Sequence, residues 1–167
     1  MMKKSTRQLV LSALFAALVC VVTMLIKVPS PFKGYFNLGD CMVLLSGWLL
    51  SPLYGFFAAG IGSALADVFS GFAVYAPVTF VIKGLTALTA FALYKTLEKK
   101  TKDIPGRIIS GLSGEAVMVI GYYIFEGFMY GFAASSVNIL PNILQAAAGL
   151  ISGIVLIKVF QKTKISI

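Results

Sequence analysis

Histidine is absent from this 167-residue chain, and acidic residues are scarce, with six Asp and Glu against fourteen Lys and Arg. The lack of histidine excludes Ser-His and Cys-His nucleophile pairs, HExxH zinc sites and haem ligation by histidine. The two cysteines, Cys20 and Cys41, lie in or beside apolar runs without metal-ligand spacing. We interpret them as core thiols, and we expect no metal site and no catalytic residue.

A phosphate-binding loop of the form G-x-x-x-x-G-K-[ST] is also missing, so the chain does not use ATP by that route. Charged residues make up only 12% of the chain and hydrophobic residues 59%. Soluble domains are about 45–50% apolar and about 25% charged. The composition therefore predicts an integral membrane protein, with one domain over residues 1–167 and room for roughly six spans.

Four apolar runs are long enough to be clear spans: Leu9–Ile26, Pro77–Tyr94, Ile108–Tyr130 and Ile139–Phe160. The stretch Cys41–Phe69 is harder to interpret. As one helix it would be about 44 Å long, which exceeds a hydrocarbon core of about 30 Å. The Ser51-Pro52 pair divides it into a short helix and a fuller one.

Basic residues indicate the topology. Lys and Arg cluster before the first span, between residues 95 and 107, and after the last span. Cytoplasmic loops carry such an excess, which requires an even number of crossings between these clusters. We therefore predict an all-α bundle of six transmembrane helices in a bacterial cell membrane, with both termini cytoplasmic. The net charge of +8 is explained by topology and does not indicate a nucleic-acid partner. The outer connections are expected at Lys27–Gly39, Ser70–Ala76 and Tyr130–Val137.

Two predicted spans each carry a polar stripe at helical spacing. The first stripe comprises Glu115, Tyr122, Glu126 and Met129, and the second comprises Asn138, Asn142, Gln145, Gly149 and Ser152. Polar groups facing lipid are costly, so both stripes should face the bundle interior. They either join the helices or line a pocket that opens outward.

Three further ionisable residues lie in or beside spans. Asp67 and Lys83 are placed so that they could pair, and Asp40 begins a helix that its side chain could cap. A pocket explains two stripes and a charged pair better than interhelical hydrogen bonds alone. Carboxylates, amides and tyrosines suit a small ring bearing hydroxyl or amino groups. The predicted substrate-binding residues are Asn37, Asp67, Tyr75, Lys83, Tyr122, Glu126, Asn142 and Gln145, and the role of Glu115 stays open.

Small side chains form a smooth stripe on the first span: Ala13, Ala16, Ala17 and Cys20. In lipid, small residues spaced by four allow close approach of two helix backbones. The stripe either packs inside the bundle or docks a partner.

The chain resembles the substrate-binding S components of energy-coupling factor (ECF) vitamin transporters. The stretches that carry the resemblance are SALFAAL at Ser12–Leu18, GYFNLGD at Gly34–Asp40, SALADVFSGFAVYAPVTFVIKGL at Ser63–Leu85, GEAVMVIGYYIFE at Gly114–Glu126 and PNILQ at Pro141–Gln145. The resemblance covers nearly the whole chain and is most specific from Gly34 to Leu85. It is nearest to the hydroxymethylpyrimidine- and pyridoxine-like branch of the riboflavin-type family.

The resemblance implies a subunit that captures a small vitamin or precursor outside the cell. It further implies as partners a membrane T subunit, which packs on Ala13-x-x-x-Ala17, and two ATPase subunits that use ATP. The S component then delivers its ligand inward by toppling, and it carries no cofactor of its own. Hydroxymethylpyrimidine or pyridoxine is the favoured ligand, and riboflavin is the larger alternative. Two other functions remain open from the residues alone: a proton- or ion-coupled carrier that relays through Asp67, Glu115 and Glu126, and an intramembrane enzyme that uses these carboxylates.

Overall fold

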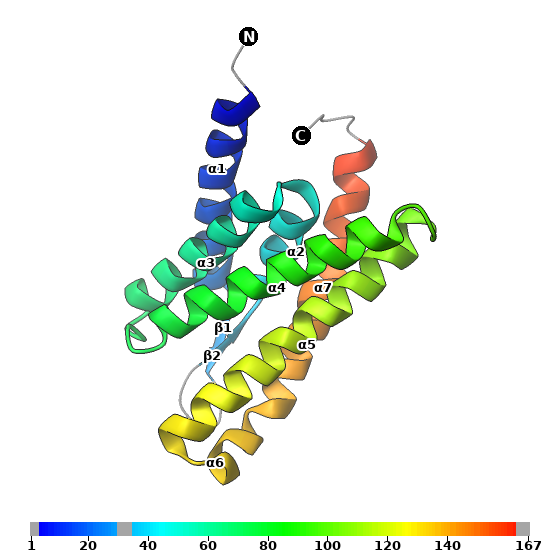
Figure 1. The fold of residues 1–167 in the computed structure, drawn as a ribbon. Coiled ribbons are helices and arrows are strands. Elements are labelled where there is room, and N and C mark those ends of the chain that lie inside the picture. Colours follow the sequence, from blue (N-terminus) through cyan, green and yellow to red (C-terminus); the bar gives the residue numbers. More distant parts are fainter. Residues whose placement is uncertain (1–3, 30–34, 163–167) are drawn as a thin grey trace.

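The computed structural model describes residues 4–29 and 35–162, which form a helical bundle with one small two-stranded ribbon (Figure 1). The described elements, in chain order, are α1 (Lys4–Leu25), β1 (Lys27–Pro29), β2 (Tyr35–Asn37), α2 (Asp40–Leu49), α3 (Pro52–Phe69), α4 (Ala76–Leu97), α5 (Asp103–Tyr130), α6 (Phe132–Val137) and α7 (Ile139–Lys162).

Five of the described helices, α1, α3, α4, α5 and α7, are long and apolar enough to cross a membrane. The remaining predicted span, the second in chain order, corresponds to α2, which has only ten residues. At 1.5 Å per residue it is about 15 Å long, roughly half of a hydrocarbon core. Eight of its ten residues are buried, so α2 is a core helix that the longer helices surround. The six predicted spans are therefore five long helices and one short helix, and the predicted division of Cys41–Phe69 into a short helix and a fuller one is confirmed.

The break between α2 and α3 lies where the sequence predicted it. Leu50 and Ser51 have extended backbone angles, and Pro52 is the first residue of α3. Proline disfavours a helical conformation in the residue before it, and its missing N–H costs nothing at the start of a helix. The chain can therefore reverse direction after α2 and continue at once as α3.

Two of the predicted outer connections contain regular structure that the sequence interpretation missed. In the first, β1 pairs antiparallel with β2, with Lys27 opposite Asn37, so the fold is not purely helical. In the third, Gly131 has a φ of 92°, which ends α5 and allows the chain to turn directly into α6. Lys33, predicted in the first connection, lies outside the described residues.

Glycines allow close contact between two pairs of helices. A Cβ added at Gly62 of α3 would lie 2.4 Å from the carbonyl oxygen of Ala16 on α1. A Cβ added at Gly149 of α7 would lie 2.6 Å from the Cβ of Asp40 on α2. Neither distance is tolerated, so both helix pairs depend on the absence of a side chain at these positions.

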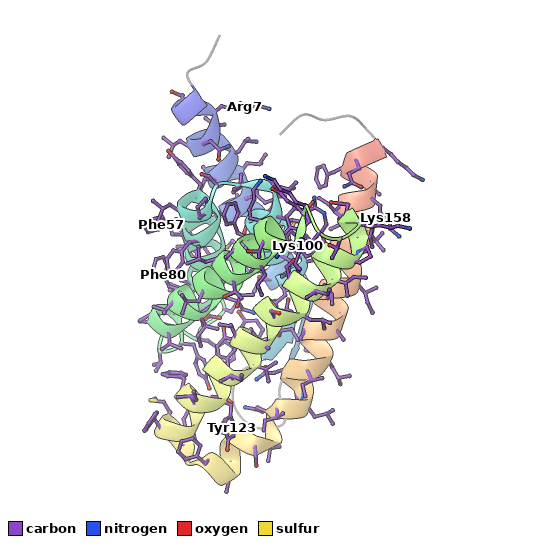
Figure 2. All side chains as sticks on the ribbon, turned by 45° about the vertical axis from the view of Figure 1, so that its right-hand side comes forward. Arg7, Phe57, Phe80, Lys100, Tyr123 and Lys158 are labelled. Carbon is purple, nitrogen blue, oxygen red and sulfur yellow. The ribbon has the colours of Figure 1, made fainter. Side chains whose placement is uncertain are left out.

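The N-terminal end of α1, the C-terminal end of α7 and the connection between α4 and α5 all lie at the same end of the bundle (Figure 1). Arg7, Lys100 and Lys158 are found there, whereas Tyr123 lies towards the opposite end (Figure 2). This arrangement agrees with an even number of crossings between the basic clusters.

Candidate ligand-binding site

A cavity of about 40 Å³ lies between β2, the α3–α4 connection and helices α3, α4, α5 and α7. Its lining residues are Tyr35, Asn37, Asp67, Phe72, Tyr75, Thr79, Tyr122, Glu126, Asn142 and Gln145. Seven of the eight predicted substrate-binding residues are among them, and the eighth, Lys83, lies behind Tyr122. The sequence interpretation missed Tyr35, Phe72 and Thr79 as lining residues.

Asp67 supplies a buried carboxylate to the cavity. The hydroxyl of Tyr35 donates to its Oδ1 over 2.7 Å, and its Oδ2 has no hydrogen-bond partner among the described residues. Burial, reinforced by the Asp67 charge, raises the pKa of Tyr35, so this hydroxyl stays protonated and donates. The Tyr35 ring packs against Phe72, with 5.0 Å between ring centroids. One acceptor oxygen of Asp67 is therefore occupied, and the other is left for a donor that enters the cavity.

Glu126 supplies the second carboxylate, at the α5 wall. The amide of Asn138 donates to its Oε2 over 2.9 Å, and both side chains are buried. Tyr75 packs edge-on against Phe125, with 5.3 Å between centroids. Burial, with Tyr130 and Glu126 nearby, raises the pKa of Tyr75, so this hydroxyl also stays protonated. The wall thus offers both an acceptor and a donor.

Lys83 lies beneath the cavity and does not pair with Asp67, which corrects the prediction. Its ammonium donates to Asp40, and both side chains are buried. The ammonium also lies 5.5 Å from the ring centroid of Tyr122, whose hydroxyl shares a hydrogen bond of 3.0 Å with Thr79. The central position of α2 explains the correction, because it brings Asp40 into the middle of the bundle, beside α4.

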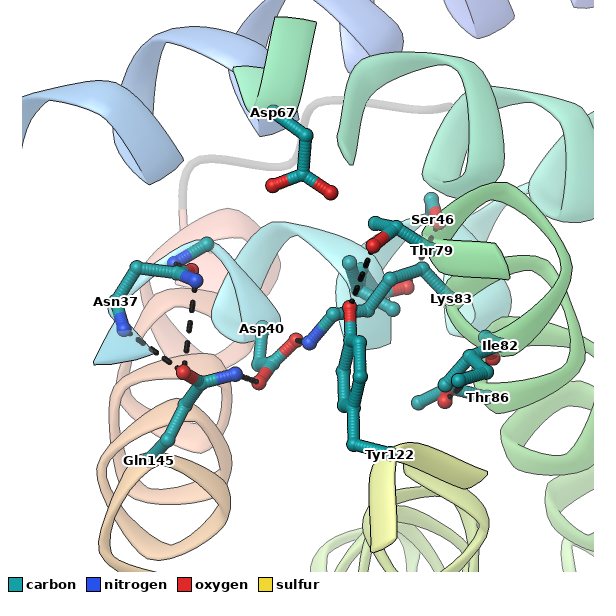
Figure 3. A network of polar contacts seen from close by, with 12 residues as sticks. Asn37, Asp40, Ser46, Asp67, Thr79, Ile82, Lys83, Thr86, Tyr122 and Gln145 are labelled. Atoms are coloured by element: carbon teal, nitrogen blue, oxygen red, sulfur yellow. Dashed lines mark hydrogen bonds and ion pairs between the residues drawn. The ribbon is translucent and has the colours of Figure 1, made fainter. Parts of the chain in front are cut away.

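The sequence left open that the Asp40 side chain caps α2, and the structure shows Asp40 in the first turn of α2 without such a cap. No side-chain cap hydrogen bond forms at the start of α2, and Asp40 is fully buried. Its Oδ2 accepts from the Gln145 amide over 2.6 Å. The Gln145 oxygen in turn accepts from the backbone N–H of Asn37 over 2.8 Å (Figure 3). An acidic residue at a helix start gives the same sequence signal in both roles, and only the fold separates them.

The polar stripe of α5 is only partly directed at the cavity. Tyr122 and Glu126 line it, but Met129 is 46% exposed. Glu115 is buried and lines a separate apolar groove between α5 and α7, with no hydrogen-bond partner for either carboxylate oxygen among the described residues. A helix of 28 residues is about 42 Å long, so one face meets different neighbours along its length.

The small-residue stripe of α1 lies on the outside of the bundle. Ala13 and Ala17 are exposed, and Ala16 is partly buried against α3. Together they line an apolar groove of about 650 Å³ between α1 and α3. Ala16 therefore packs on α3, and Ala13 and Ala17 leave a smooth exposed surface beside it. Docking of a partner on this surface stays a prediction.

Comparison with known proteins decides the class of this site. Residues 3–162 match the family described as ECF-type riboflavin transporter, S component. The chain belongs to this family. It is a non-enzymatic transport subunit of the cell membrane, which binds a small substrate and works with an ECF module. This excludes the intramembrane enzyme.

The S component has similar relatives of known sequence. A protein from Pyrococcus woesei described as "uncharacterized protein in gap 3'region" is 41% identical over 137 residues, covering 81% of this chain and 88% of that protein. The thiamine precursor transporter HmpT of Lactococcus lactis subsp. cremoris (strain MG1363) is 27% identical, covering 97% of this chain and 92% of HmpT.

Two solved structures share the fold. The S component of a bacterial ECF transporter matches with a TM-score of 0.77 and 24% identity, over 96% of this chain and 98% of that one. The S component for biotin from an ECF-type ABC transporter matches with a TM-score of 0.68 and 17% identity, over 97% and 95% of the two chains. At these identities the likeness concerns the fold of the S component alone.

Proposed function

We propose that this S component captures a small single-ring vitamin precursor in the cavity, with hydroxymethylpyrimidine favoured over pyridoxine and over riboflavin. The observation that carries the proposal is the lining itself. Buried carboxylates of Asp67 and Glu126 lie around one small space with the side chains of Asn142 and Gln145. The eight residues that the sequence predicted are proposed as the substrate-binding set, with Lys83 acting from behind the lining.

The chemistry of the lining favours a ligand that donates hydrogen bonds. Carboxylates only accept when ionised, whereas amides and tyrosine hydroxyls both donate and accept. An aminopyrimidine offers an exocyclic amine to Asp67 or Glu126, and its ring nitrogens accept from Tyr75 or Asn142. No Lys or Arg is among the described lining residues. A phosphate ester would therefore meet two carboxylates without a balancing cation, so the unphosphorylated form is the expected ligand.

Size and relationship both support a single ring. The cavity of about 40 Å³ is close to the space of one or two waters. A single ring requires a smaller expansion of this space than a fused three-ring system does. The relative HmpT, described as a thiamine precursor transporter, matches over nearly the whole chain. That relationship favours the pyrimidine branch for this S component as well.

The transport cycle that we propose combines the topology with the α1 groove. Residues 1–167 form one domain with cytoplasmic termini, and the cavity opens at the outer side. A membrane T subunit packs on Ala13 and Ala17, and two ATPase subunits supply the energy from ATP. The exposed α1 groove supports the docking step, because small residues on a lipid-facing surface permit a close helix contact.

Equilibrium binding to the purified chain tests the proposal. Hydroxymethylpyrimidine should bind most tightly, pyridoxine more weakly and riboflavin most weakly, without ATP. A reversed order would overturn the single-ring assignment. The alternative of a proton- or ion-coupled carrier predicts uptake by vesicles that contain this chain alone and hold a proton gradient. The S-component proposal predicts no uptake by those vesicles until the T and ATPase subunits are added.

A further inference from the structure

A chain of directed hydrogen bonds joins the lining of the cavity to the centre of the bundle. It runs from Asn37 on β2 through Gln145 on α7 to Asp40 on α2, and it ends at Lys83 on α4 (Figure 3). Asn37 and Gln145 line the cavity, whereas Asp40 does not. Four elements that are distant in sequence thus meet in one polar network.

Each member of the chain has its donor and acceptor ends fixed. The carboxylate of Asp40 only accepts, so the Gln145 amide must turn its nitrogen towards Asp40. Its oxygen then necessarily faces Asn37, where it accepts from the backbone N–H and, over 3.4 Å, from the side-chain amide. The Asn37 side chain is oriented in the same way, because its own oxygen accepts from the backbone N–H of Gly39 over 2.8 Å.

Asp40 itself is held from two sides. Lys83 occupies its Oδ1, and Gly149 leaves just enough space for its Cβ. The carboxylate is completely buried, so it cannot reorient towards water. Buried hydrogen-bond chains of this kind are directional. If the donor or acceptor at one end is changed, each amide in the chain must rotate to keep its hydrogen bonds.

We propose that Asp40 is a positioning residue that holds the ribbon β1–β2 against the cavity through Gln145. This inference rests on the proposed function, because it assigns to Asp40 control of how long a bound ligand stays. Loss of the acceptor at position 40 leaves the Gln145 nitrogen unsatisfied. The amide then turns away, and the Asn37 N–H loses its partner. The ribbon moves more freely, and the ligand leaves faster.

Two double variants test the role of Asp40 without leaving a buried charge unpaired. Asp40→Asn with Lys83→Met keeps an oxygen for Gln145, and Asp40→Leu with Lys83→Met has nearly the same shape but no oxygen. Replacing a buried ion pair by neutral groups of similar volume is generally tolerated, so both variants should fold. The measurement is hydrogen exchange of the Asn37 backbone amide in the ligand-free protein, with the buried α2 amide of Leu44 as a monitor of global opening.

We expect the Asn37 backbone amide to exchange roughly tenfold faster in Asp40→Leu/Lys83→Met than in Asp40→Asn/Lys83→Met, because its hydrogen bond to Gln145 is lost. Exchange of the Leu44 amide should be the same in both variants. Dissociation of a radiolabelled ligand, hydroxymethylpyrimidine as the probe, should be faster by a similar factor. Equal exchange at Asn37 in the two variants would overturn the role of Asp40. Failure of the wild-type protein to bind the probe would instead count against the proposed function, while the exchange comparison would still decide the positioning role.

Discussion

At the scale of single residues, the cavity is notable for buried carboxylates whose described hydrogen-bond partners carry no positive charge. An ionisable group inside a membrane protein costs about 2.5–3.5 kcal/mol on insertion scales, so it is retained where it has a task. Asp67 and Glu126 are buried, and the partners described for them, Tyr35 and Asn138, are neutral side chains. A ligand that donates hydrogen bonds would offset part of this cost.

Replacement of Asp67 by Asn tests this reasoning. The substitution keeps the shape and one oxygen but removes the charge and one acceptor. We expect the Kd for hydroxymethylpyrimidine to rise about tenfold to a hundredfold, the loss of one charge-assisted hydrogen bond. Glu98→Gln is the matched control, since Glu98 pairs with Lys95 at the exposed α4–α5 end. Equal affinities for the two variants would remove Asp67 from the binding set.

Replacement of Glu115, unlike that of Asp67, is expected to improve a property of the protein, namely its stability. It is 2% exposed, and its oxygens have no partner among the described residues. A buried polar group without a partner costs about 1–3 kcal/mol. Glu115→Met should therefore stabilise the protein by about that amount and raise its melting temperature, with ligand affinity unchanged. A lower melting temperature would show that Glu115 has a partner in the membrane.

The sequence located most of the polar lining but not all of its partners. Helical spacing placed Tyr122, Glu126, Asn142 and Gln145 on inward faces, because lipid penalises the other faces. The partner of Lys83 was mistaken, since spacing within a helix does not tell which neighbouring helix is in contact. Tyr35 of β2 was missed as a lining residue because a strand of three residues leaves only a weak signal in the sequence.

At the scale of elements, α2 lies at the centre of the bundle and supplies Asp40, which binds the lining residue Gln145. Proline marked its end in the sequence, but its role as a buried core helix became visible only with the five long helices around it. The ribbon β1–β2 was predicted as a loop, because Pro and Gly are dense in that stretch and each strand has only three residues. Short elements of this kind are decided by tertiary contacts.

The contact between α2 and α7 gives a third prediction. Gly149→Ala places a Cβ 2.6 Å from the Cβ of Asp40, so the two helices must separate. Overpacking of this kind costs about 1–3 kcal/mol, and it should also raise the Kd of the ligand by moving Gln145. Thermal unfolding and ligand titration would measure the two effects. The control, Ala147→Val on the exposed side of α7, should change neither, and a Gly149→Ala protein of wild-type stability would contradict the packing.

At the scale of the whole molecule, we propose that ligand binding and subunit docking use two separate surfaces. The cavity takes the ligand, and the α1 groove takes the T subunit. Charge distribution along the chain predicted that the ends of α1 and α7 lie on the same side, and the structure places them at the same end of the bundle (Figure 1). Composition therefore determined the membrane class, and the positions of Lys and Arg determined the parity of the crossings. The structure was needed to show that one of the six predicted spans has only ten residues.

Separation of the two surfaces gives a fourth prediction. Ala17→Trp fills the α1 groove with a large side chain, so it should abolish capture of the T subunit and ligand uptake by the assembled transporter. Ligand affinity of the isolated chain should stay the same, because the cavity is lined by other elements. Ala147→Trp, on the exposed side of α7, is the matched control and should assemble normally. Normal uptake by Ala17→Trp would place the docking surface elsewhere.

The central claim is that this S component holds a small, donor-rich, single-ring molecule in its cavity. Mass spectrometry of the small molecule that copurifies with the intact chain from its membrane tests this most directly. The account predicts an unphosphorylated aminopyrimidine, bound to the wild-type chain and depleted from Asp67→Asn. Copurification of riboflavin or of a phosphate ester, or equal retention by the variant, would contradict it.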